Sequence, residues 1–90
     1  MYMVDNYIKV FYYEEKEYPI ELLKIGDTVK ALTLPYSAKY IDYCKENVGI
    51  VVSKDHKSIY DVKIKKEDGS VCYAIEEYMR ASCIIEKIVG

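Results

Sequence analysis

The sequence has few of the residues from which catalytic and metal sites are usually built. Its 90 residues include no Trp, one Phe, one His, three Cys and four Gly. His56 lies in a hydrophilic segment between lysines, and Cys44, Cys72 and Cys83 form no CxxC pair of the kind that a zinc ribbon or a disulfide scaffold needs. The glycines stand alone, so there is no Gly-rich phosphate loop. We therefore expect no catalytic residues, no metal ligands, no cofactor and no enzyme activity.

The sequence also lacks long apolar runs and a large excess of charge of one sign. Runs such as Ile50-Val51-Val52 are far shorter than the roughly 20 residues that span a membrane, and the first residues lack the basic-then-apolar order of a signal peptide. Thirteen Lys plus Arg against fifteen Asp plus Glu leave a net charge of −2, whereas a non-specific DNA coat needs a strongly positive one. With three thiols that show no disulfide pattern, this composition predicts a cytoplasmic protein without a membrane partner.

Apolar residues recur at alternate positions along most of the chain, which is typical of β-strands. Gly26 and Asp27 predict a tight turn with a positive φ and a side-chain cap, and Asp68-Gly69 is a strong hairpin signal. Gly49, inside an apolar run, predicts a bulge or the close approach of another backbone. The expected strands cover residues 7–13, 18–25, 29–33, 48–52, 60–64, 71–75 and 82–89, with Pro19 confined to a sheet edge.

Two further expectations concern helices and faces. Ser37 is a suitable N-cap for two helical turns over residues 38–46, which Asn47 would end, and residues 76–79 fit a single helical turn. Val71, Tyr73 and Ile75 are expected to share one face of the strand that pairs with residues 60–64, with Cys72 and Ala74 on the other face.

The order of these motifs resembles the SH3-like small β-barrels, including KOW-like modules and small phage and bacterial proteins. The resemblance covers roughly residues 22–80 and implies a mainly β fold: a barrel of five to seven antiparallel strands with one short helix in its long loop. We expect a single structural domain, with the barrel over residues 22–90 and an N-terminal hairpin extension over residues 1–21 packed on it. The motifs that carry the resemblance are residues 24–29, 48–52, 60–64, 68–69 and 73–77.

Tyrosines at helical spacing in the long loop are the first candidate site. Tyr36, Tyr40 and Tyr43 recur on one side, with Lys39 at the rim. Such a face either packs on the barrel as a lid or projects as an aromatic ridge that docks on a protein. In the second case the chain is a non-catalytic protein-interaction module, for example a small phage-encoded protein that binds and modulates a host or cellular protein.

Lysines between residues 54 and 66 are the alternative site. This stretch carries a net charge of +3 and suits a KOW-like nucleic-acid or ribosome-associated binder. A solvated, salt-bridged face explains the same pattern, and lysine is a poor bidentate reader of bases or phosphate. A homo-oligomer that pairs strands between copies is a third alternative. The residues of the alternative face are Lys54, Lys57, Tyr60, Lys63, Lys65 and Lys66.

Overall fold

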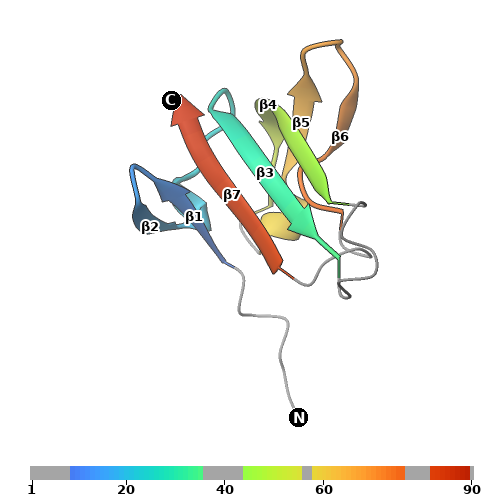
Figure 1. Cartoon of the computed structure of the whole chain (residues 1–90). Coiled ribbons are helices and arrows are strands. Elements are labelled where there is room, and N and C mark those ends of the chain that lie inside the picture. Colours follow the sequence, from blue (N-terminus) through green and yellow to red (C-terminus); the bar gives the residue numbers. More distant parts are fainter. Residues whose placement is uncertain (1–8, 36–43, 56–57, 77–81, 90) are drawn as a thin grey trace.

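Seven strands form one mixed sheet in the computed structural model, which describes residues 9–35, 44–55, 58–76 and 82–89. The strand order is β2-β1-β7-β3-β4-β5-β6, and all neighbouring pairs are antiparallel except β1 and β7 (Figure 1). The strands are β1 Val10–Tyr13, β2 Lys16–Pro19, β3 Thr28–Leu34, β4 Lys45–Ser53, β5 Lys63–Lys66, β6 Val71–Tyr73 and β7 Ser82–Val89. Two single-turn 3-10 helices accompany them, η1 Ile20–Leu22 and η3 Ile59–Asp61. None of the helices among the described residues is long and apolar enough to cross a membrane.

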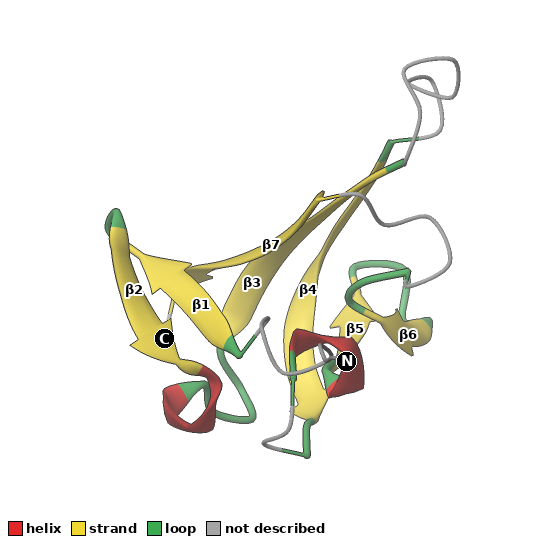
Figure 2. Cartoon of the chain, turned by 90° about the horizontal axis from the view of Figure 1, so that it is seen from below, coloured by secondary structure: helices red, strands yellow, loops and turns green. Residues whose placement is uncertain are grey.

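The expected antiparallel barrel is wrong in two respects. The sheet is an open arch whose ends are β2 and β6, with η1 and η3 beneath it (Figure 2). It is also mixed, because β7 inserts between β1 and β3 and runs parallel to β1. The edge strand β2 carries Lys16, Glu17 and Pro19, which hinder pairing with another chain, and the edge position of Pro19 is confirmed.

The core lies under the arch. The inward-facing residues of β3, Val29, Ala31 and Thr33, are buried, as the alternation of the sequence predicts. The 3-10 helices each add one buried isoleucine to the core, and Leu23 follows η1. The buried apolar residues are Phe11, Ile20, Leu23, Val29, Ala31, Val51, Ile59, Val62, Ile64, Ala74, Ile75 and Ile85.

The turn before β3 has the predicted geometry. Gly26 has a φ of +104°, and the Asp27 carboxylate accepts a hydrogen bond from the Lys24 amide at 2.9 Å. The backbone of this turn exchanges two hydrogen bonds with Val51 of β4, each at 2.9 Å. Lys87 of β7 places its Nζ 3.7 Å from Asp27 Oδ2. The turn therefore ties β3, β4 and β7 together at one end of the sheet.

The backbone of β5 lies close to the Cα of Gly49 in β4. A Cβ at this position would lie 2.6 Å from the carbonyl oxygen of Lys65 and 3.1 Å from Cδ1 of Ile64. Real Cβ atoms essentially never show a contact as short as 2.6 Å, so only glycine fits without movement of β5. The predicted close approach of another backbone is confirmed.

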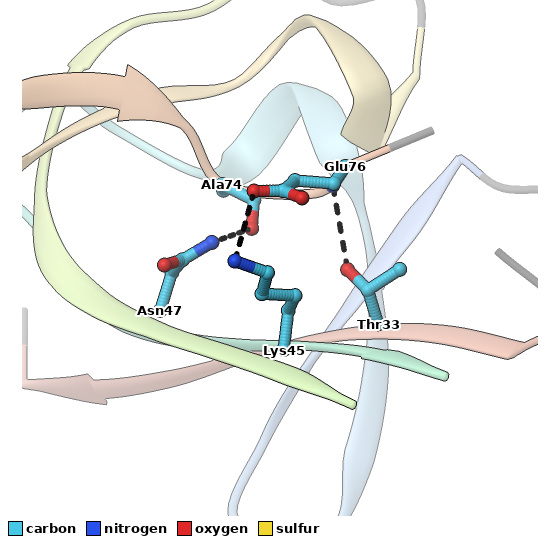
Figure 3. Close-up of polar contacts among 5 residues, drawn as sticks. All are labelled: Thr33, Lys45, Asn47, Ala74 and Glu76. Atoms are coloured by element: carbon cyan, nitrogen blue, oxygen red, sulfur yellow. Dashed lines mark hydrogen bonds and ion pairs between the residues drawn. The ribbon is translucent and has the colours of Figure 1, made fainter. Parts of the chain in front are cut away.

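The segment that follows β6 is held beneath β3 and β4 by buried polar side chains (Figure 3). Asn47 donates from Nδ2 to the carbonyl of Ala74 at 3.1 Å, and Thr33 Oγ1 accepts from the Glu76 amide at 3.4 Å. Lys45 and Glu76 add an ion pair of 3.9 Å at the rim. These contacts explain why Thr33 and Asn47 are buried: each satisfies a backbone group of a segment that has left the sheet.

Three local expectations need correction or fall outside the described residues. Lys45, Glu46 and Asn47 belong to β4, so the expected helix does not extend over residues 45–46 and Asn47 is no helix stop. Residues 36–43 and 77–79, where the rest of this helix and most of the 76–79 turn were expected, lie outside the described residues. Val71 and Tyr73 face outward, because β6 pairs them with Lys65 and Lys63 while Cys72 opposes the buried Ile64.

Candidate protein-interaction surface

The outer side of the sheet carries a group of exposed aliphatic side chains. Strands alternate their side chains between two faces, so the inward Val51 and Ile85 leave their neighbours pointing outward. We call this group the outer aliphatic face. Its members are Val48, Ile50 and Val52 of β4, with 43%, 47% and 37% of their surface exposed, and Ile84 and Ile88 of β7, with 41% and 46% exposed.

The strand register arranges this face in rows across β7, β3 and β4. One row is Ile84, Leu32 and Glu46, and the next is Glu86, Lys30 and Val48. Thr28 and Ile50 lie opposite each other in a third row. The first row contains one charged residue, Glu46. In the second row Lys30 lies opposite Glu86, so a positive and a negative charge compensate each other.

A hollow of about 880 Å³ opens beside this face, between β4 and the β5–β6 hairpin. Val48 and Ile50 supply apolar lining. Asp68 is held in the hairpin turn, where its carboxylate accepts hydrogen bonds from the Ser70 amide at 2.9 Å and the Ser70 hydroxyl at 2.7 Å. These hydrogen bonds lower the pKa of Asp68, so its charge persists in mild acid. The charged residues that line the hollow are Glu46, Lys65, Lys66, Glu67 and Asp68.

The lysines of the alternative nucleic-acid face do not point the same way. Lys63 and Lys65 lie on the outer side of β5, and Lys63 Nζ is 5.1 Å from the centre of the Tyr73 ring. Lys54 donates to the backbone carbonyl of Glu21 at 3.4 Å. Tyr60 belongs to η3 and packs against the core, so it is not interleaved with Lys63 and Lys65 as expected.

The tyrosine site predicted from the sequence lies outside the described residues. This applies to Tyr36, Lys39, Tyr40 and Tyr43, and also to Lys57. Sequence reasoning missed the outer aliphatic face, although a signal was present. Adjacent apolar pairs such as Val51-Val52 and Ile84-Ile85 must place one member on each side of a strand, so one of the two is exposed unless both faces are covered.

The titratable groups of the described residues do not gather into a metal site, since no group of three or more His, Cys, Asp or Glu side chains there is arranged to hold an ion. One tyrosine on the outer side is perturbed. The Glu17 carboxylate lies beside Tyr12 and accepts a hydrogen bond from its hydroxyl at 3.3 Å. The negative charge of Glu17, together with a little desolvation and this hydrogen bond, raises the pKa of Tyr12.

Comparison with known proteins adds no family to these observations. The chain matches no family model, no curated protein and no solved structure.

Proposed function

We propose that this chain is a non-catalytic protein-interaction module that docks on a cellular protein through the outer aliphatic face. The observation that supports this proposal is the run of exposed aliphatic residues on β4. Val48, Ile50 and Val52 are successive outward residues of this strand, and Ile84 and Ile88 lie two strands away on the same side of the sheet. Surfaces of this kind are typical of interaction sites, whereas single exposed apolar residues are ordinary.

The expected strength of binding follows from the same side chains. Complete burial of one isoleucine or valine stabilises by about 1.5–3 kcal/mol, and these residues are already half-buried. Each side chain therefore contributes roughly 1 kcal/mol to the free energy of binding. The charged residues around them affect the orientation of the partner more than the affinity. Binding of moderate, reversible strength is the expected outcome.

The partner on this proposal is a protein with an apolar patch of its own. For a phage-encoded protein it would be a host factor whose activity changes when this surface is occupied. The loop residues Tyr36, Lys39, Tyr40 and Tyr43 are a proposed second contact on the same partner. A nucleic-acid partner is the alternative, and it would use Lys63 and Lys65 together with Lys54, Lys57, Tyr60 and Lys66.

A capture experiment with matched variants tests the proposal. The tagged chain is incubated with lysate that has been treated with nuclease, and bound protein is compared between wild type, Ile50→Glu and Ile84→Glu. Leu22→Glu is the control, because Leu22 is 53% exposed but lies in η1, on the opposite side of the sheet from the face. Loss of the partner in the two face variants, with retention in the control, supports the proposal. Equal capture by all four proteins contradicts it.

The alternative predicts a different pattern. A nucleic-acid binder loses its partner after nuclease treatment and loses affinity steeply as salt is raised. It is weakened by Lys63→Glu and Lys65→Glu and is indifferent to Ile84→Glu, since β7 lies three positions from β5 in the sheet.

A further inference from the structure

The two central strands of the outer face carry complementary side chains in the same rows. Ile84 of β7 lies opposite Leu32 of β3, and Glu86 lies opposite Lys30. Each strand carries one apolar and one charged residue in these two rows, and the charge is negative on β7 and positive on β3. Opposite charges in the same row of adjacent strands allow a surface to bind a copy of itself. A two-fold axis between the two strands places each strand over the other strand of the second copy, so each charge faces its opposite.

From this pattern we infer that the outer aliphatic face binds a second copy of the chain. This inference rests on the proposed function, since it assigns a second copy of the chain, beside a cellular protein, to the same proposed surface. The two sheets stack face to face about a two-fold axis that runs along the strands between β7 and β3. Each β7 then lies over β3 of the other copy, with the two strands aligned.

The contacts of this arrangement are favourable in two rows of β7 and β3. Glu86 faces Lys30 of the second copy, and Ile84 faces Leu32 of the second copy, with both contacts repeated by symmetry. One strand further out, β4 lies over β1 of the second copy, which places Val48 over Tyr12, because Tyr12 shares the row of Glu86. Aromatic and β-branched side chains pack well in such positions.

A different placement of the axis is disfavoured by charge. With the axis along β3, Lys30 would face Lys30 of the second copy. That contact joins like charges. The charges of β7 and β3 therefore favour the axis between these two strands over an axis along β3.

The size of the interface predicts its strength. Four strands spaced about 4.8 Å apart and about seven residues long, each rising about 3.3 Å, form a face of about 19 by 23 Å. Two such faces bury on the order of 900 Å², which is below the range of about 1,200–2,000 Å² of stable complexes and within that of weak, transient ones. A net charge of −2 per chain adds little repulsion. We expect a reversible dimer with a dissociation constant in the micromolar range.

Sedimentation velocity of the full chain from about 10 μM to 1 mM tests the inference. The weight-average mass is expected to rise from 10.5 kDa toward twice that value. Lys30→Glu and Glu86→Lys are each expected to abolish the rise, because like charges then face each other across the axis. An equimolar mixture of the two variants is expected to restore it as a heterodimer, since every charge at the interface again faces its opposite. Lys16→Glu, on the edge strand β2, is the control and dimerises like wild type.

The mixture separates the interface from the fold. Each variant also disturbs the Lys30–Glu86 neighbours within its own sheet, and mixing cannot repair that, so restored association is due to contacts between copies. A wild type that stays monomeric at 1 mM overturns the inference, and so does a mixture that fails to associate. If the chain is monomeric but the Ile50→Glu and Ile84→Glu variants lose a captured protein, the proposed function stands without the dimer. If the chain is monomeric and capture is unchanged, both are refuted.

Discussion

The contact between Gly49 and β5 makes the sharpest prediction about stability. In Gly49→Ala the new Cβ would lie 2.6 Å from the Lys65 carbonyl oxygen and 3.0 Å from its carbon. Ordinary contacts begin at 3.4 Å, so β5 must retreat by about 3.4 − 2.6 = 0.8 Å along this line. The obstacle is backbone, which cannot turn away as the end of a flexible side chain does. Its movement would strain the ladder between β4 and β5 and the packing of Ile64 beneath it.

The expected cost is about 1–3 kcal/mol, the usual range for overpacking. Without the clash, alanine would stabilise a strand by roughly 0.5–1 kcal/mol relative to glycine, so the sign of the change is diagnostic. For a domain of this size, 1 kcal/mol corresponds to about 4–8 °C in Tm. Urea unfolding measures the difference in midpoint, with the slope expected to be unchanged because the same surface is exposed.

Asparagine substitutions provide the control for this mechanism. Gly69 has a φ of +91° and open space around its Cβ position, so Gly69→Asn is expected to be milder than Gly69→Ala, because asparagine tolerates positive φ. At Gly49 the opposite order of stability is expected: the Gly49→Asn variant is less stable than Gly49→Ala, because asparagine is larger. A Gly49→Ala variant whose free energy of unfolding is equal to or higher than that of the wild type would refute the reasoning.

Three further predictions concern other parts of the molecule. Asn47→Ala leaves the buried Ala74 carbonyl without its hydrogen bond and is expected to cost about 1–3 kcal/mol in urea unfolding. Its exposed neighbour variant Glu46→Ala is expected to stay within about 0.5 kcal/mol, and equal effects would contradict the role of the amide. The β1–β2 turn holds Glu14 and Glu15 at φ of 52° and 68°, so Glu14→Asn combined with Glu15→Gly is expected to raise stability by about 1 kcal/mol, and an unchanged Tm would argue against strain there. Glu17→Gln is expected to lower the pKa of Tyr12 toward 10.0, read from its ring carbon shift by NMR. Because the pKa of Tyr12 is raised in the folded chain, its contribution to stability is complete below pH 10 and is lost as pH rises through the folded pKa; an unmoved titration in Glu17→Gln would contradict this cause.

Local signals account for much of what was predicted correctly. The alternation in β3, the extent of β7, the turn at Gly26 and Asp27 and the close approach at Gly49 all depend on residues near one another in the sequence or on one residue's special geometry. The errors lie where two periodicities fit equally well. In residues 71–75 both alternate sets are apolar, so the pattern does not say whether Val71 and Tyr73 face in or out. Asn47 was expected to stop a helix because asparagine tolerates positive φ, yet its amide is used by a carbonyl 27 residues away.

The amino-acid sequence by itself determined that this chain forms short strands joined by tight turns, because side-chain alternation and the backbone freedom of glycine act over a few residues. Only the tertiary structure decided that β7 enters between β1 and β3, that the sheet stays open, and that η1, η3 and the segment after β6 cover one face of it. That choice also decided which member of each apolar pair is exposed, and so where the outer aliphatic face lies. The reason is physical: a strand with apolar residues on both sides can bury either one, and contacts between residues far apart in the chain choose the side.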